Sequence, residues 1–222
     1  MFPLSYFGQN DIDSSELYET TLKVQNYMLS AEQKYNEKDF YGAIEILTKG
    51  IEMMPDTLKS LSGGMFYSVR VKSKIELGDN YGAISDYTNG INLLQELVKN
   101  LSIDSNLISM TFYQRAMTKK NIGDINGAVF DLTNAIKFNP EYEEAYYARA
   151  LGKSVNENYW DAIIDLNKVI DLNPNNAKAY TLRGMTKKIY LNQNPNPECS
   201  DYKKGCDLGD SKACEYYNEG CY

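Results

Sequence analysis

The stretch YQRAMTKKNIGDINGAVFDLTNAIKFNP runs from Tyr113 to Pro140, and YARALGKSVNENYWDAIIDLNKVIDLNP runs from Tyr147 to Pro174, 34 positions further on. Each has an Arg at its third position, an Ala and an Asp 13 and 16 positions after that Arg, and a closing Asn-Pro. Apolar residues recur at helical spacing on both sides of a polar turn, which predicts two amphipathic helices, and the proline stops the second one. One such hairpin cannot bury its own apolar face, so several copies must stack.

Similar units occur before and after these two. The small residues of the second helices align at Ala43, Ala83, Ala128 and Ala162, and a fifth first helix begins at Tyr180. The period, the alanine and the closing proline resemble the tetratricopeptide repeat (TPR). The resemblance implies an all-α fold, a right-handed TPR solenoid of about 4.5 repeats. After a terminal segment at 1–12 we expect the solenoid at 13–191, with units near 24–57, 64–97, 109–142, 143–176 and 177–191.

Composition and charge argue against several classes of function. The formal net charge is −7 and the basic residues are not clustered, so nucleic acid is not an expected partner. No apolar run reaches the roughly 20 residues of a membrane span, so no transmembrane segment is expected. The sequence has no histidine, the commonest general base and zinc ligand, and it lacks the nucleotide-binding, hydrolase and metalloprotease motifs. We expect no enzymatic activity, no metal and no cofactor.

Three arginines on first helices each precede an aspartate on the second helix by 16 positions. They are Arg70 with Asp86, Arg115 with Asp131, and Arg149 with Asp165. The first unit has Ser30 and Ile46 at the corresponding positions, so both members of the pair are lost together. Because an unpaired charge between packed helices is costly, we interpret these as structural ion pairs. A charged binding column is the alternative.

The TPR resemblance implies that the first helices line a concave groove in which an extended peptide or a partner helix binds. The inward residues are expected to be aromatic or apolar in the middle and basic at the edges: Tyr113, Met117, Lys120, Tyr147, Leu151, Met185, Lys188 and, from the second unit, Lys72. Tyr and Met suit adaptable protein interfaces. For Met117, Leu151 and Met185, core packing between neighbouring helices is slightly favoured over contact with a partner. The two tyrosines are the better candidates for contact.

All four cysteines lie in the last 24 residues of the sequence. Two short helices are expected there, and cysteines seven positions apart on one helix have sulfurs about 10 Å apart, which does not suit a four-cysteine zinc site. Folding the helices back at residue 210 brings Cys206 to Cys214 and Cys199 to Cys221, which predicts two disulfides in a hairpin at 192–222. The stretch GCDLGDSKAC also resembles the bacterial Sel-like repeats, in which such a pair bridges a helical hairpin. Four reduced thiols are the alternative.

Disulfides indicate an oxidising compartment. The N-terminal MFPLSYFGQ resembles the end of a secretory signal peptide without its basic region, and an ordinary terminus is the alternative. We therefore expect a periplasmic or secreted bacterial protein, with the cytoplasm as the alternative location. The expected function is a non-catalytic scaffold that binds a protein or peptide partner, as a monomer or weak homo-oligomer. The alternative is a self-associating structural subunit of a larger envelope assembly.

Overall fold

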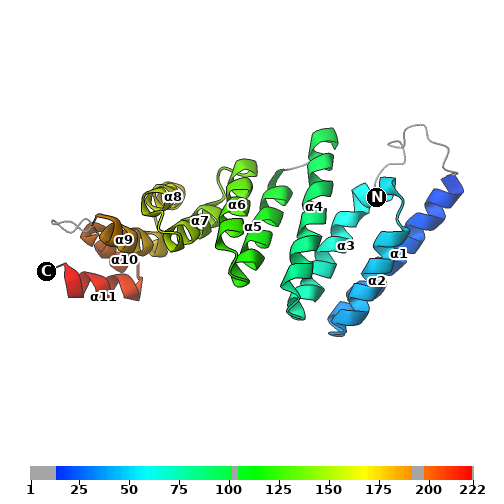
Figure 1. The fold of residues 1–222 in the computed structure, drawn as a ribbon, viewed down its shortest axis with the longest axis horizontal. Helices are drawn as coiled ribbons and strands as arrows, with labels where there is room; N and C mark the ends of the chain where they lie inside the picture. Colours follow the sequence, from blue (N-terminus) through cyan, green and yellow to red (C-terminus); the bar gives the residue numbers. More distant parts are fainter. Residues whose placement is uncertain (1–13, 102–104, 192–197, 222) are drawn as a thin grey trace. The chain divides into compact units, whose positions relative to one another are not determined.

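The computed structural model describes residues 14–101, 105–191 and 198–221, and all regular secondary structure within these ranges is helical (Figure 1). The chain divides into two compact units, Met1–Asn100 and Leu101–Tyr222. The expected terminal segment at 1–12 lies outside the described residues. The helices are α1 (Ser14–Asn36), α2 (Phe40–Met53), α3 (Asp56–Glu76), α4 (Asn80–Leu101), α5 (Ser105–Asn121), α6 (Ile125–Phe138), α7 (Glu143–Val155), α8 (Tyr159–Leu172), α9 (Ala177–Leu191), α10 (Cys199–Asp207) and α11 (Ser211–Gly220).

In the first unit, α2 packs against both α1 and α3. Their shared core includes Leu47, Ile51 and Phe66, all of which are buried. Gly50 permits the close approach of α2 and α3, because the Phe66 ring occupies the space that a Cβ at position 50 would need. Interiors are close-packed, so a larger residue there would push the two helices apart. The first repeat is therefore the α1–α2 hairpin, and α3 begins the next.

In the second unit, each helix from α5 to α10 packs against the helix that follows it in the chain (Figure 1). The unit is thus a continuous stack of helical hairpins. The core shared by α7, α8 and α9 combines two larger apolar residues with small ones at the helix crossings: Leu166, Val169, Ala150, Ala162 and Ala179. The alanines allow the helices to approach closely, as the repeat pattern predicts.

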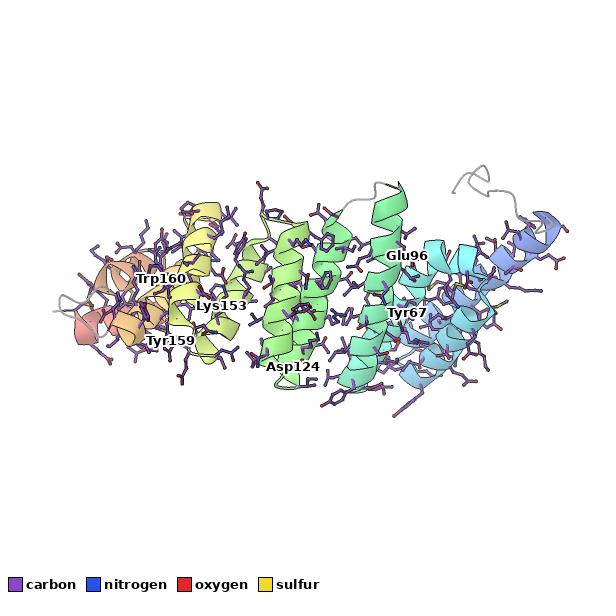
Figure 2. All side chains as sticks on the ribbon, turned by 45° about the horizontal axis from the view of Figure 1, so that its top comes forward. Tyr67, Glu96, Asp124, Lys153, Tyr159 and Trp160 are labelled. Atoms are coloured by element: carbon purple, nitrogen blue, oxygen red, sulfur yellow. A yellow bond between two sulfur atoms is a disulfide. The ribbon has the colours of Figure 1, made fainter. Side chains whose placement is uncertain are left out.

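The Gly-Asp pair of the repeat forms the turn between its two helices. Gly78 and Gly123 have φ angles of 75° and 82°, in the left-handed region that glycine adopts without steric cost. The aspartate that follows caps the second helix: Asp124 accepts a hydrogen bond from the Gly127 amide at 2.9 Å. Figure 2 labels Asp124 at the start of α6. One dipeptide therefore both ends the first helix and begins the second.

A network of one aspartate and two cations joins the two helices of each later repeat. Asp131 on α6 is fully buried, and the Arg115 guanidinium donates to both of its oxygens, at 2.7 and 2.9 Å. The Lys119 ammonium lies 2.8 Å from Oδ2 of the same carboxylate. The same arrangement recurs, with the expected Arg–Asp pair and an added lysine, in Arg70–Asp86–Lys74 and Arg149–Asp165–Lys153.

The helix α10 takes the place of the second helix of a fifth repeat. Arg183 on α9 donates to both carboxylate oxygens of Asp201 on α10, and Lys187 lies 2.8 Å from that carboxylate. This pair did not stand out in the sequence, because 18 positions rather than 16 separate the Arg from the Asp. The C-terminal hairpin therefore continues the repeat array as well as closing it.

Both predicted disulfides are present in this hairpin. Cys199 is bonded to Cys221 and Cys206 to Cys214, with Cα atoms 5.6 and 4.5 Å apart. The all-α fold with a disulfide-linked C-terminal hairpin is thereby confirmed. Across the described ranges, no helix combines the length and the low polarity needed to cross a bilayer.

Candidate partner-binding face

The Arg–Asp pairs determine which side of each first helix faces away from the second helix. Successive residues of an α-helix are turned by about 100°, so the positions two before and two after the Arg lie on the side opposite to it. In the second unit, the residues expected to line the groove occupy these positions, together with the lysines three residues further along the same side. We call them the groove face: Tyr113, Met117 and Lys120 on α5, Tyr147 and Leu151 on α7, and Met185 and Lys188 on α9.

The middle of the groove face is apolar and open to solvent. Leu151 and Met185, which occupy the same position in successive repeats, keep 38% and 37% of their surface exposed, and Met117 is half-buried. Leu151 and Met185 are therefore not enclosed between helices. Lys120 and Lys188 are exposed near the C-terminal ends of α5 and α9. The face thus offers accessible apolar side chains with cations beside them.

The two tyrosines of the groove face are half-buried. The Tyr113 ring packs against Tyr142, with ring centroids 5.1 Å apart. Burial raises the pKa of Tyr113, and it raises the pKa of Tyr142 to about 12. Burial also raises the pKa of Tyr147, to which the Asp210 carboxylate adds. Both groove-face hydroxyls are therefore neutral at physiological pH and can donate a hydrogen bond to a bound partner.

The helix α11 closes the groove face at α9. Thr181, the α9 counterpart of the two tyrosines, is buried, and its hydroxyl donates a 2.7 Å hydrogen bond to Asp210, the N-cap of α11. At the other end of α11, the Lys188 ammonium lies near Gly220, where a Cβ would be 3.8 Å from Nζ. The helix α11 therefore runs alongside α9 in the same direction. A cation beside its C-terminal end is favourable to the helix dipole.

Lys72 and Ser154 occupy repeat positions equivalent to those of the groove face but are not part of it. Lys72 lies on α3 of the first unit, two residues after Arg70, with its side chain exposed. Lys72 is therefore a candidate partner-contact residue of the first unit alone. Ser154 on α7 occupies the position that is lysine on α5 and α9, and its Oγ is buried without a hydrogen-bond partner among the described residues. The basic edge is therefore interrupted at α7.

The chain matches no protein-family model and no curated protein. Solved structures with a similar fold include a crystal structure of MamA, at 18% identity, covering 90% of this chain and 97% of that one with a TM-score of 0.67. YrrB, described as a TPR protein with an unusual peptide-binding site, has 14% identity over 92% and 97% of the two chains and a TM-score of 0.67. A tetratricopeptide repeat protein from Parabacteroides merdae has 17% identity over 84% and 72%, with a TM-score of 0.63. This chain therefore has the TPR fold.

Proposed function

We propose that the protein is a non-catalytic scaffold that holds an extended peptide or a partner helix against the groove face. The observation that supports this most is the exposure of Leu151 and Met185 at the same position of successive repeats. Burying large apolar side chains that lie in register on one face is favourable. A partner that covers them gains this burial, while Tyr113 and Tyr147 contribute ring surface and hydroxyl donors.

The chemistry of the groove face favours a partner segment with both apolar and acidic side chains. Apolar groups would contact Leu151 and Met185, and carboxylates would meet Lys120 and Lys188 beside them. Methionine is flexible and adapts to partners of different shape. The peptide-binding site described for YrrB, whose fold is similar, supports a peptide as the class of ligand.

The proposed role is non-catalytic and the proposed location is periplasmic or secreted. The buried carboxylates of Asp86, Asp131 and Asp165 are each held by an Arg and a Lys, which leaves them unavailable to a substrate. Disulfides persist in oxidising compartments, so the doubly bridged hairpin supports export. A cytoplasmic protein with reduced thiols is the alternative.

The double variant Tyr113→Ala/Tyr147→Ala is expected to weaken partner binding by about tenfold or more, since each lost aromatic contact costs on the order of 1 kcal/mol. The immobilised protein would capture proteins from the envelope fraction of its native host. The affinity of the captured partner would then be measured by titration for the parent and the variant.

A matched control removes two tyrosines outside the groove face. Tyr41 and Tyr81 are exposed in the first turns of α2 and α4, so Tyr41→Ala/Tyr81→Ala should leave binding unchanged. Because the groove-face tyrosines are half-buried, Leu151→Lys/Met185→Lys provides a second variant at solvent-exposed positions. Unchanged affinity in both groove-face variants, with thermal unfolding intact, would mean that the partner binds elsewhere.

A second candidate function is a self-associating structural subunit of an envelope assembly. The observation that favours it lies in the first unit, where α1 exposes an apolar side. The two functions use different surfaces, so one does not exclude the other.

A further inference from the structure

The first helix has two apolar sides. Leu17, Val24, Met28 and Ala31 are buried against the rest of the first unit. On another side, Tyr18, Leu22 and Leu29 keep 65%, 42% and 64% of their surface exposed. We call these three residues the α1 stripe. At about 100° per residue they lie within roughly 40° of one another around the helix, so they form one continuous line.

In the next repeat, two of the three counterparts of the α1 stripe, 40 positions further on, pack against the repeat that precedes them, and the third is Ser62. Leu58 corresponds to Tyr18 and is buried in the core shared with α1 and α2. Val69 corresponds to Leu29 and packs against that same core. The α1 stripe is therefore a repeat-stacking surface that lacks a neighbour in the described chain.

The other end of the repeat array does not show this feature. Over residues 198–221, α10 and α11 have no large apolar side chain among those that are exposed, and their exposed residues include Lys203, Lys204, Lys212 and Glu215. Terminal repeats need a polar outer face for solubility. The last helix meets this requirement and the first does not. A head-to-tail contact of α1 with the end of another copy would consequently bury charges without apolar gain.

We propose that the α1 stripe pairs with the α1 stripe of a second copy of this chain, in an antiparallel dimer with two-fold symmetry. The two outer residues of the stripe, Tyr18 and Leu29, are related about the point between residues 23 and 24. Tyr18 lies as far before this point as Leu29 lies after it, and Leu22 and Gln25 are related in the same way. A two-fold axis through this point places Tyr18 of each copy opposite Leu29 of the other, as an isologous interface requires.

The electrostatics of the pairing are favourable. The line from Ser15 through Tyr18, Leu22, Gln25 and Leu29 to Gln33 contains no charged residue, so the contact desolvates no charge along it. The contact buries on the order of 1,000 Å² in total, which is the size of a weak, reversible dimer.

Sedimentation velocity of the full chain over a wide concentration range tests the proposal. The parent should pass from monomer to dimer as concentration rises. Tyr18→Glu and Leu29→Lys should each raise the dissociation constant at least about tenfold, by placing an unpaired charge in the contact. The double variant Tyr18→Glu/Leu29→Lys should restore the dimer, because a two-fold axis sets each glutamate opposite a lysine of the other copy. The two positions are about 16 Å apart along one helix, so they cannot pair within one chain.

The control is Tyr41→Lys, on α2, where the tyrosine is more exposed than any residue of the stripe, and this change should leave the dimer unchanged. Either of two results would overturn the proposal. One is a parent that stays monomeric at every concentration, as expected if residues 1–13 or a different protein cover the stripe. The other is a double variant no better than the single variants. Neither of these two results involves the groove face, so neither would contradict the proposed scaffold function.

Discussion

Replacing Asp131 by alanine is expected to lower the free energy of unfolding by about 3–5 kcal/mol, the largest effect of any single substitution considered for this protein. The carboxylate is fully buried and is the shared partner of Arg115 and Lys119. Without it, two cations that are mostly buried lose their counter-charge and cannot reach water without disrupting the α5–α6 contact. Urea unfolding of the second unit, monitored by circular dichroism, measures this loss in the free energy of unfolding.

Asp161→Ala is the matched control, because Asp161 is exposed in the first turn of α8 and should contribute well under about 1 kcal/mol. The triple variant Arg115→Met/Lys119→Met/Asp131→Leu should recover most of the loss. The first repeat shows that an apolar solution exists, because Ile46 stands at the aspartate position there. A loss below about 1 kcal/mol for Asp131→Ala would show that the network does not hold the two helices together.

The second large effect concerns the disulfides, which join α11 to α10 and whose removal is expected to release α11 from α10. By loop-closure entropy, bridges closing loops of 8 and 22 residues contribute about 2.5–3.5 kcal/mol each, with the nested bridge adding less. The helix has 10 residues and a single fully buried side chain, Ala213, so it has little else to hold it. In the variant with all four cysteines replaced by serine, amide hydrogen exchange in α11 should become at least about tenfold faster.

In the same hydrogen-exchange measurement, helices that the bridges do not join serve as the reference. Protection in α6 should not change, since the bridges lie in the last hairpin and α6 is held by the Asp131 network. Protection in α9 should fall only where Thr181 loses its bond to Asp210. Equal protection of α11 with and without the bridges would mean that packing, such as the contact between the Tyr202 and Tyr216 rings, is sufficient to dock it.

Periodic features were predictable from the sequence. The 16-position spacing of Arg and Asp follows from two helices of fixed length and one turn, and the structure pairs these residues in three repeats. The cysteine pairing was predictable because a single turn relates both pairs. The added lysines had an equally regular signal, four positions after each Arg, and could have been found in the same way.

Features that depend on non-periodic contacts were not predictable. The Arg183–Asp201 pair has a different spacing, and the Thr181–Asp210 bond joins residues 29 positions apart that are not part of the repeat pattern. Whether Leu151 and Met185 are exposed could not be decided from their position, because Thr181 on the same side of α9 is buried by α11. Accessibility depends on which neighbour covers a helix, and periodicity does not report that.

Site-specific photo-crosslinking tests the proposed partner contact most directly. A photoreactive phenylalanine analogue would be placed at Leu151 or Met185 on the groove face, and at Phe130 or Ile164 as controls. The control side chains are also exposed and apolar, but they lie on α6 and α8 beside the buried aspartates, on second helices. We expect crosslinks to one partner from Leu151 and Met185 and none from the controls. Crosslinks from Phe130 and Ile164, with none from the groove face, would contradict the proposed function.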